Sequence, residues 1–66
     1  MEATKKIISE IKNEMNKNSS TFESAWASYS NNCLNKEIVN NAILENKWDI
    51  DEVGFDNLEY LVASEI

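Results

Sequence analysis

The side chains in this 66-residue chain that are able to act as acids, bases or ligands are almost all carboxylates. Twelve Asp and Glu residues accompany six Lys, with no Arg and no His, and the chain holds one Cys, one Gly and no Pro. Without His, neither a Ser-His-Asp triad nor a Cys-His pair can form. One Cys cannot build a Cys/His zinc site, and one Gly cannot form a glycine-rich phosphate loop. The composition therefore predicts a protein that is not an enzyme and carries no cofactor.

Two weaker chemical signals lie in the acidic segment that contains Gly54. The acids from Asp49 to Glu52 are close enough in sequence for paired-carboxylate catalysis, but so short a chain has little room for a water-excluding cleft. The motif Asp49-x-Asp51-x-x-Gly54 overlaps the opening of an EF-hand calcium loop. Positions 5 and 12 of that loop need ligands, and here they hold Val and Tyr. We expect neither catalysis nor a metal site at these residues.

The net charge of −6 belongs entirely to the second half of the chain. Residues 1–33 contain four Glu and four Lys, whereas residues 34–66 contain eight acids and two Lys. Six of those acids and one Lys lie in residues 45–59, which gives this segment a net charge of −5. Such a segment repels phosphate backbones and attracts basic protein surfaces. The alternative is that the acids only keep the chain soluble and begin helices, whose N-termini favour negative side chains.

The spacing of apolar residues, together with the scarcity of Gly and Pro, predicts an all-α protein. We expect a single small helical domain, residues 1–66, folded as a three- to four-helix bundle. The first three helices are expected at 3–17, 21–31 and 36–47, and the last at 57–64 after an acidic connection.

Polar residues at the expected boundaries are candidate N-caps. Ser20 is followed three residues later by Glu, which is the pattern of a capping box, and Asn35 precedes the third helix. Asp56 is also followed by a Glu after three residues, and we expect it to begin the last helix. The alternative is that Asp51 begins this helix, which would then run through the only glycine.

The apolar stripes of these helices define the predicted core. Cys33 extends the stripe of the second helix by one turn, so we expect a small buried hydrophobic residue there. Leu34 and Val39 are placed to form a hydrophobic staple across the start of the third helix. The predicted core residues are Ile8, Ile11, Phe22, Trp26, Tyr29, Ile43, Leu58 and Leu61.

Leu44 and Trp48 lie four residues apart, away from the main apolar side of the third helix, and Leu34 projects near them. An aromatic anchor within a charged rim is typical of a protein interface. The alternative is that the third helix is central and packed on both sides.

These features predict a small acidic protein that occupies a basic or apolar surface of a protein partner, as an inhibitor or modulator. A nucleic-acid-binding protein is one such partner. The lack of a signal-peptide pattern, of a membrane-length apolar run and of a second Cys predicts a cytoplasmic protein with no membrane contact. The expected contact residues are Leu44, Glu45, Trp48, Asp49, Asp51, Glu52, Asp56 and Glu59.

Two other functions compete with this hypothesis. A self-assembling structural or accessory protein would pair through its first helix or through Leu44 and Trp48. A helix-turn-helix regulator would contact bases through Asn40, Asn41 and Lys47. The absence of Arg and the negative charge argue against direct nucleic-acid binding, which depends on neutralising phosphates.

Overall fold

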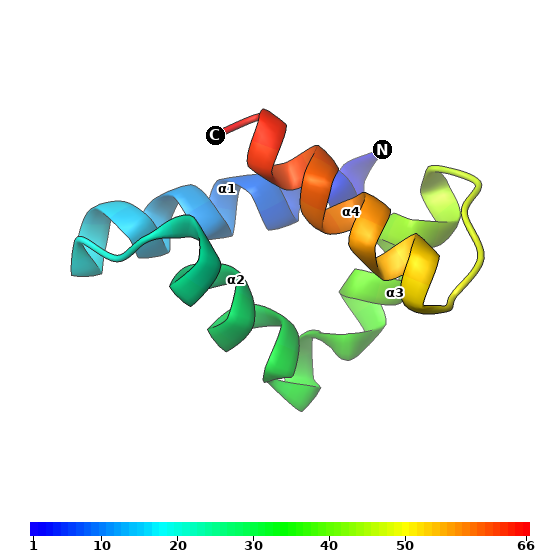
Figure 1. The fold of residues 1–66 in the computed structure, drawn as a ribbon, viewed down its shortest axis with the longest axis horizontal. Helices are drawn as coiled ribbons and strands as arrows, with labels where there is room; N and C mark the ends of the chain where they lie inside the picture. Colours follow the sequence, from blue (N-terminus) through cyan, green and yellow to red (C-terminus); the bar gives the residue numbers. More distant parts are fainter.

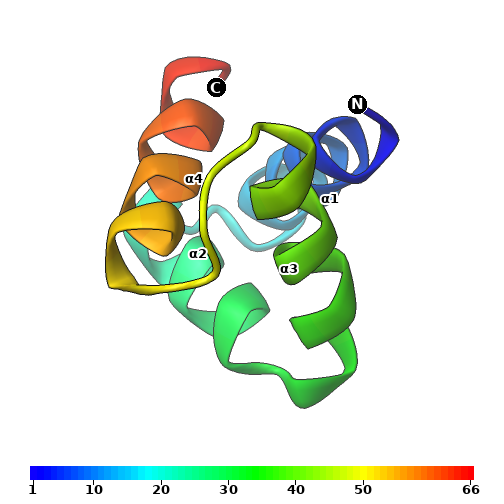
Figure 2. The same ribbon diagram turned by 90° about the vertical axis from the view of Figure 1, so that its right-hand side faces the viewer.

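In a computed structural model that describes all of residues 1–66, the chain forms four α-helices and one short 3-10 turn. The elements are α1 (Glu2–Asn18), α2 (Phe22–Asn31), η1 (Cys33–Asn35), α3 (Lys36–Glu45) and α4 (Glu52–Ser64). The chain is 80% helical and has no strand, so the predicted all-α bundle is confirmed. Figures 1 and 2 show α1 and α4 near each other, with both termini on the same side of the molecule. No helix combines the length and the apolar character that crossing a membrane requires.

The longest helix, α1, buries Thr4, Ile7 and Ile11, which lie three to four residues apart and so share one side. Ile7 is fully buried, whereas Ile8, which was predicted to lie in the core, is half-buried at its edge. The helix packs most extensively on α3. Its buried side is therefore rotated slightly from the predicted one, towards the helix that covers it.

The core combines one apolar stripe from each α-helix. Trp26 is the one predicted aromatic core residue that is buried. The centre of its ring lies 6.2 Å from that of Phe22 and 5.4 Å from that of Phe55. Phe22 and Tyr29, like Ile8 and Leu61, are only half-buried. Branched aliphatic side chains fill most of the centre, and two buried alanines lie among them. The nine buried apolar residues are Ile7, Ile11, Ala25, Trp26, Val39, Ala42, Ile43, Leu58 and Val62.

The turn between α2 and α3 differs from the prediction. Cys33 is exposed, because the chain leaves the helix in an extended conformation at Asn32 and turns away from the apolar side of α2. The Oδ1 of Asn32 then accepts a hydrogen bond from the N–H of Leu34, which begins η1. Leu34 is 85% exposed, so the expected staple with Val39 does not form.

Two predicted N-caps are also displaced. Thr21, not Ser20, caps α2, since its Oγ1 accepts a hydrogen bond of 3.2 Å from the N–H of Ser24. Asn35 precedes α3 as expected, but its side chain does not cap that helix. Its Nδ2 donates instead to the carbonyl of Tyr29, which ties η1 back to the end of α2.

The last helix begins at the earlier of the two candidate caps, so the prediction that it starts at Asp56 is wrong. The Oδ1 of Asp51 accepts a 2.8 Å hydrogen bond from the N–H of Gly54, and the helix starts at Glu52. Glycine disfavours helices by about 1 kcal/mol relative to alanine, which is why the local pattern pointed to the later start. Gly54 is buried, and a Cβ placed on it would lie 1.9 Å from the carbonyl oxygen of Asp49. Close passage of the α3–α4 connection over α4 therefore requires glycine.

We predict that Gly54→Ala destabilises the protein, although alanine is the better helix former. The clash with the backbone of Asp49 should outweigh the propensity gain and lower the free energy of unfolding by about 1–3 kcal/mol. Urea denaturation followed by circular dichroism measures this change. The matched control is Asn57→Ala, which is exposed on the same helix and should be neutral or slightly stabilising. Stabilisation by both substitutions would contradict the packing at Gly54.

Candidate functional site

The eight residues expected to contact a partner lie in three separate places. They are Leu44 and Glu45 at the end of α3, Trp48, Asp49 and Asp51 in the connection to α4, and Glu52, Asp56 and Glu59 along α4. The acidic segment therefore spans the end of α3, the connection and α4, and each part has its own surroundings.

Glu45 serves the N-terminus of α1. Its two carboxylate oxygens accept hydrogen bonds of 3.0 Å from the N–H of Ala3 and 3.2 Å from the N–H of Thr4, and a third from the Thr4 hydroxyl. Asn46 adds a 3.1 Å hydrogen bond to the same hydroxyl. These N–H groups belong to the first turn of α1 and have no partner within their own helix. Glu45 thus acts as a cap supplied by another helix, because Met1 provides none.

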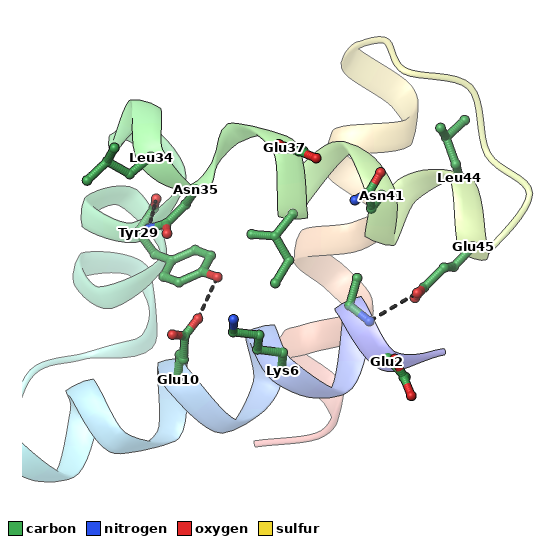
Figure 3. A pocket seen from close by; sticks show the side chains of 12 residues that line it. Glu2, Lys6, Glu10, Tyr29, Leu34, Asn35, Glu37, Asn41, Leu44 and Glu45 are labelled. Atoms are coloured by element: carbon green, nitrogen blue, oxygen red, sulfur yellow. Dashed lines mark hydrogen bonds between the residues drawn. The ribbon is translucent and has the colours of Figure 1, made fainter.

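The second group surrounds the connection between α3 and α4. Trp48, Asp49 and Asp51 help to line a hollow of about 210 Å³ there. Trp48 is half-buried and packs against the core, and Asp51 is the N-cap of α4. Leu44 is 54% exposed and instead lines a groove between α1 and α3, which is shown in Figure 3. Leu44 and Trp48 therefore line different hollows.

The third group lies along the outer side of α4. Glu52, Asp56 and Glu59 are spaced four and three residues apart, so their carboxylates share one side of the helix. The buried residues of α4 lie on the opposite side. Glu52 lies in the first turn of α4, where the helix N-terminus favours an acid. Asp56 and Glu59 lie beyond that turn, and acids three or four residues apart repel one another by about 0.2–0.5 kcal/mol per pair, so helix stability does not explain these two.

The start of α2 completes this surface. Glu23 is exposed there, and together with Asp56 and Glu59 it borders a hollow of about 340 Å³ between α2 and α4. Tyr60 also borders the hollow and is 79% exposed. We call this surface the acidic face, which consists of Glu23, Glu52, Asp56, Glu59 and Tyr60.

Two members of the acidic face were missed in the sequence. Glu23 lies in the half of the chain with no net charge, and only the packing of α2 beside α4 brings it near Asp56. Tyr60 was expected to pack against Phe55 at the start of a helix capped by Asp56, and so it was not among the predicted contact residues. It lies seven residues after Val53 on the same side of α4, and both side chains are exposed.

No group of three or more His, Cys, Asp or Glu side chains is arranged to hold a metal ion. Comparison with protein-family models, with curated proteins and with solved structures finds no match to this chain.

We predict that Glu45 makes the stability of the protein depend on pH in the acid range. Hydrogen bonds from the N–H groups of Ala3 and Thr4 hold the pKa of Glu45 below its ordinary value of 4.5. A carboxyl whose pKa is lowered by folding stabilises the protein above its unfolded pKa, and this contribution is lost as the pH falls through the folded pKa. The native protein should lose stability between about pH 6 and pH 3 more steeply than Glu45→Gln.

Thermal unfolding followed by circular dichroism across this pH range measures both slopes. Glu65→Gln, which removes an exposed carboxylate at the other end of the chain, is the matched control and should keep the native slope. Parallel pH profiles for the native protein and Glu45→Gln would contradict the role of Glu45 as a cap.

Proposed function

We propose that this chain is a non-enzymatic, cytoplasmic protein-binding module that docks on a basic surface of a partner protein through its acidic face. The observation that carries the proposal is the grouping of three carboxylates from two helices, those of Glu23, Asp56 and Glu59, with the exposed Tyr60 around one hollow. Glu52 extends this charge by one turn along α4. The module acts as an inhibitor or modulator, because occupying a surface requires no catalytic group. Proteins that hold nucleic acid present such basic surfaces and form one class of partner.

The chemistry of the acidic face suits arginine and lysine side chains. Its carboxylates attract cations over several ångströms and accept charge-assisted hydrogen bonds from a guanidinium or ammonium group. The ring of Tyr60 offers a face on which a guanidinium can stack. Exposed aromatic residues within a charged rim are also where protein interfaces concentrate their binding energy.

The two competing functions gain less support from the observed arrangement. Self-assembly through a patch formed by Leu44 and Trp48 is not favoured, because these two residues line different hollows. For direct DNA binding, Asn41 was expected to contact bases, but it lines the groove between α1 and α3 together with four glutamates. Carboxylates at that place repel a phosphate backbone.

We predict that three neutral substitutions on the acidic face weaken capture of the partner. The variant is Glu52→Gln, Asp56→Asn and Glu59→Gln, and its matched control removes three charges outside both this face and the groove between α1 and α3: Glu14→Gln, Asp49→Asn and Glu65→Gln. Each exposed ion pair contributes about 0.2–1 kcal/mol, so affinity should fall roughly tenfold and its salt dependence should flatten.

The experiment is affinity capture from a lysate of the source cell, followed by titration of the retained protein at several salt concentrations. The proposal expects a stoichiometric partner with a basic surface, retained by the native chain and the control but poorly by the face variant. Equal retention by all three proteins, or loss of binding only in the control, would refute docking through this face.

A further inference from the structure

The groove between α1 and α3 is a second surface that shares no residue with the acidic face. The groove has a volume of about 760 Å³. In Figure 3 it faces the viewer, and α4 lies behind it. Two leucines line it, of which Leu34 is 85% exposed and Leu44 is 54% exposed, and Ile38 lies half-buried between them in sequence. Large exposed apolar side chains that line a common concave surface mark an interaction site more strongly than scattered ones.

One wall of the groove is a single side of η1 and α3. Leu34, Ile38, Asn41 and Leu44 follow one another at intervals of four, three and three residues, which is the repeat of one helix side. From Leu34 to Leu44 this wall is about 15 Å long, or nearly three helical turns. The other wall is α1, which runs in roughly the opposite direction in Figure 3.

Hydrogen bonds fix the walls at both ends of the groove. At one end Glu45 of α3 accepts hydrogen bonds from the first turn of α1. At the other end the hydroxyl of Tyr29, on α2, donates a 2.7 Å hydrogen bond to Oε2 of Glu10 on α1, and the carbonyl of Tyr29 accepts one from Asn35 of η1. Burial and the neighbouring Glu10 carboxylate raise the pKa of Tyr29, so its hydroxyl keeps the proton that it donates. Figure 3 shows the hydrogen bonds to Glu45 and Glu10, with Tyr29 lying between α1 and the end of α2. The groove is thus formed before any ligand arrives, which lowers the entropic cost of binding.

The charge of the groove selects among possible occupants. Four glutamates and one lysine line it, so its net charge is −3, and the lining glutamates are Glu2, Glu10, Glu37 and Glu45. A second copy of this chain carries a net charge of −6 and would be repelled. An extended peptide strand needs free backbone donors and acceptors, but the walls are helices whose backbone groups already bond within the helix. A helix needs only side-chain contacts.

We propose that this groove binds a basic amphipathic helix of a protein partner. The apolar side of that helix packs against Leu34, Ile38 and Leu44, and its lysine or arginine side chains lie against the glutamates. This is helix-in-groove recognition, with anchors about one and two turns apart. The proposal is independent of docking through the acidic face, because the two surfaces have no residue in common.

The test uses a fluorescent synthetic peptide of about 15 residues, with leucines on one helical side and lysines on the other. A second peptide has the same composition in an order that forms no apolar stripe. Fluorescence anisotropy measures the binding of both to the native chain. We expect the striped peptide to bind at least about tenfold more tightly than the shuffled one.

The decisive variant is Leu34→Asn with Leu44→Asn, and its matched control is Ile50→Asn with Val53→Asn, which removes two other exposed apolar residues. The leucine variant should bind the striped peptide about tenfold more weakly, and the control should bind it normally. Circular dichroism checks that both remain helical. Equal binding by the two variants, or equal binding of the two peptides, would overturn the proposal.

Two further measurements separate the outcomes. The triple substitution on the acidic face should leave binding of the striped peptide nearly unchanged, and a loss there would place the peptide on that face and overturn the groove. Sedimentation of the native chain should show a monomer. A dimer that the leucine variant abolishes would make a second copy the occupant and would equally overturn the proposed one.

Discussion

The carboxylate of Glu45 is the contact on which the arrangement of this small protein most depends. It joins the end of α3 to the first turn of α1, across 42 residues of sequence, and satisfies two backbone N–H groups that a helix cannot satisfy by itself. The contact also orders the two helices that pack most extensively on each other. With so little apolar surface to bury, a chain of 66 residues gains much from a polar contact between two helices that are far apart in sequence. The walls of the groove are held in place by the same contact.

The acids of this chain have different tasks, which the net charge alone does not reveal. Glu45 and Asp51 stabilise helix N-termini, and Glu10 accepts the hydrogen bond of Tyr29. Glu52 and Asp56 accept no hydrogen bond from the N-terminus of a helix, and both lie exposed along α4. The negative charge is thus partly structural and partly displayed on two surfaces, one with an exposed tyrosine beside a hollow between α2 and α4 and one with exposed leucines along the groove between α1 and α3. Under the two proposals, the first surface would bind single cationic side chains of a partner, and the second would bind the apolar stripe of a basic helix.

The helices and much of the core could be predicted from the sequence, because apolar residues repeat with the helical period in every segment. The errors arose where a distant contact outweighs a local preference. Glycine disfavours a helix, so Gly54 indicated a later start of α4. The helix nevertheless includes Gly54, because the backbone of Asp49 passes too close to this position for any side chain to fit. Cys33 continued the stripe of α2 in sequence, yet the chain turns at the preceding residue. The acidic face was predicted only in part, because Glu23 reaches it through the packing of α2 beside α4, which no local pattern encodes.

Amide hydrogen exchange at Ala3 and Thr4 tests the central role of Glu45 most directly. First-turn amides of a helix ordinarily exchange quickly, since they have no partner within the helix. Because Glu45 accepts hydrogen bonds from both, exchange at these two amides should be slow in the native protein and markedly faster in Glu45→Gln, while amides in the middle of α2 change little. Fast exchange at Ala3 and Thr4 in the native protein would contradict the account, because α1 and α3 would then lack the contact that holds the groove together.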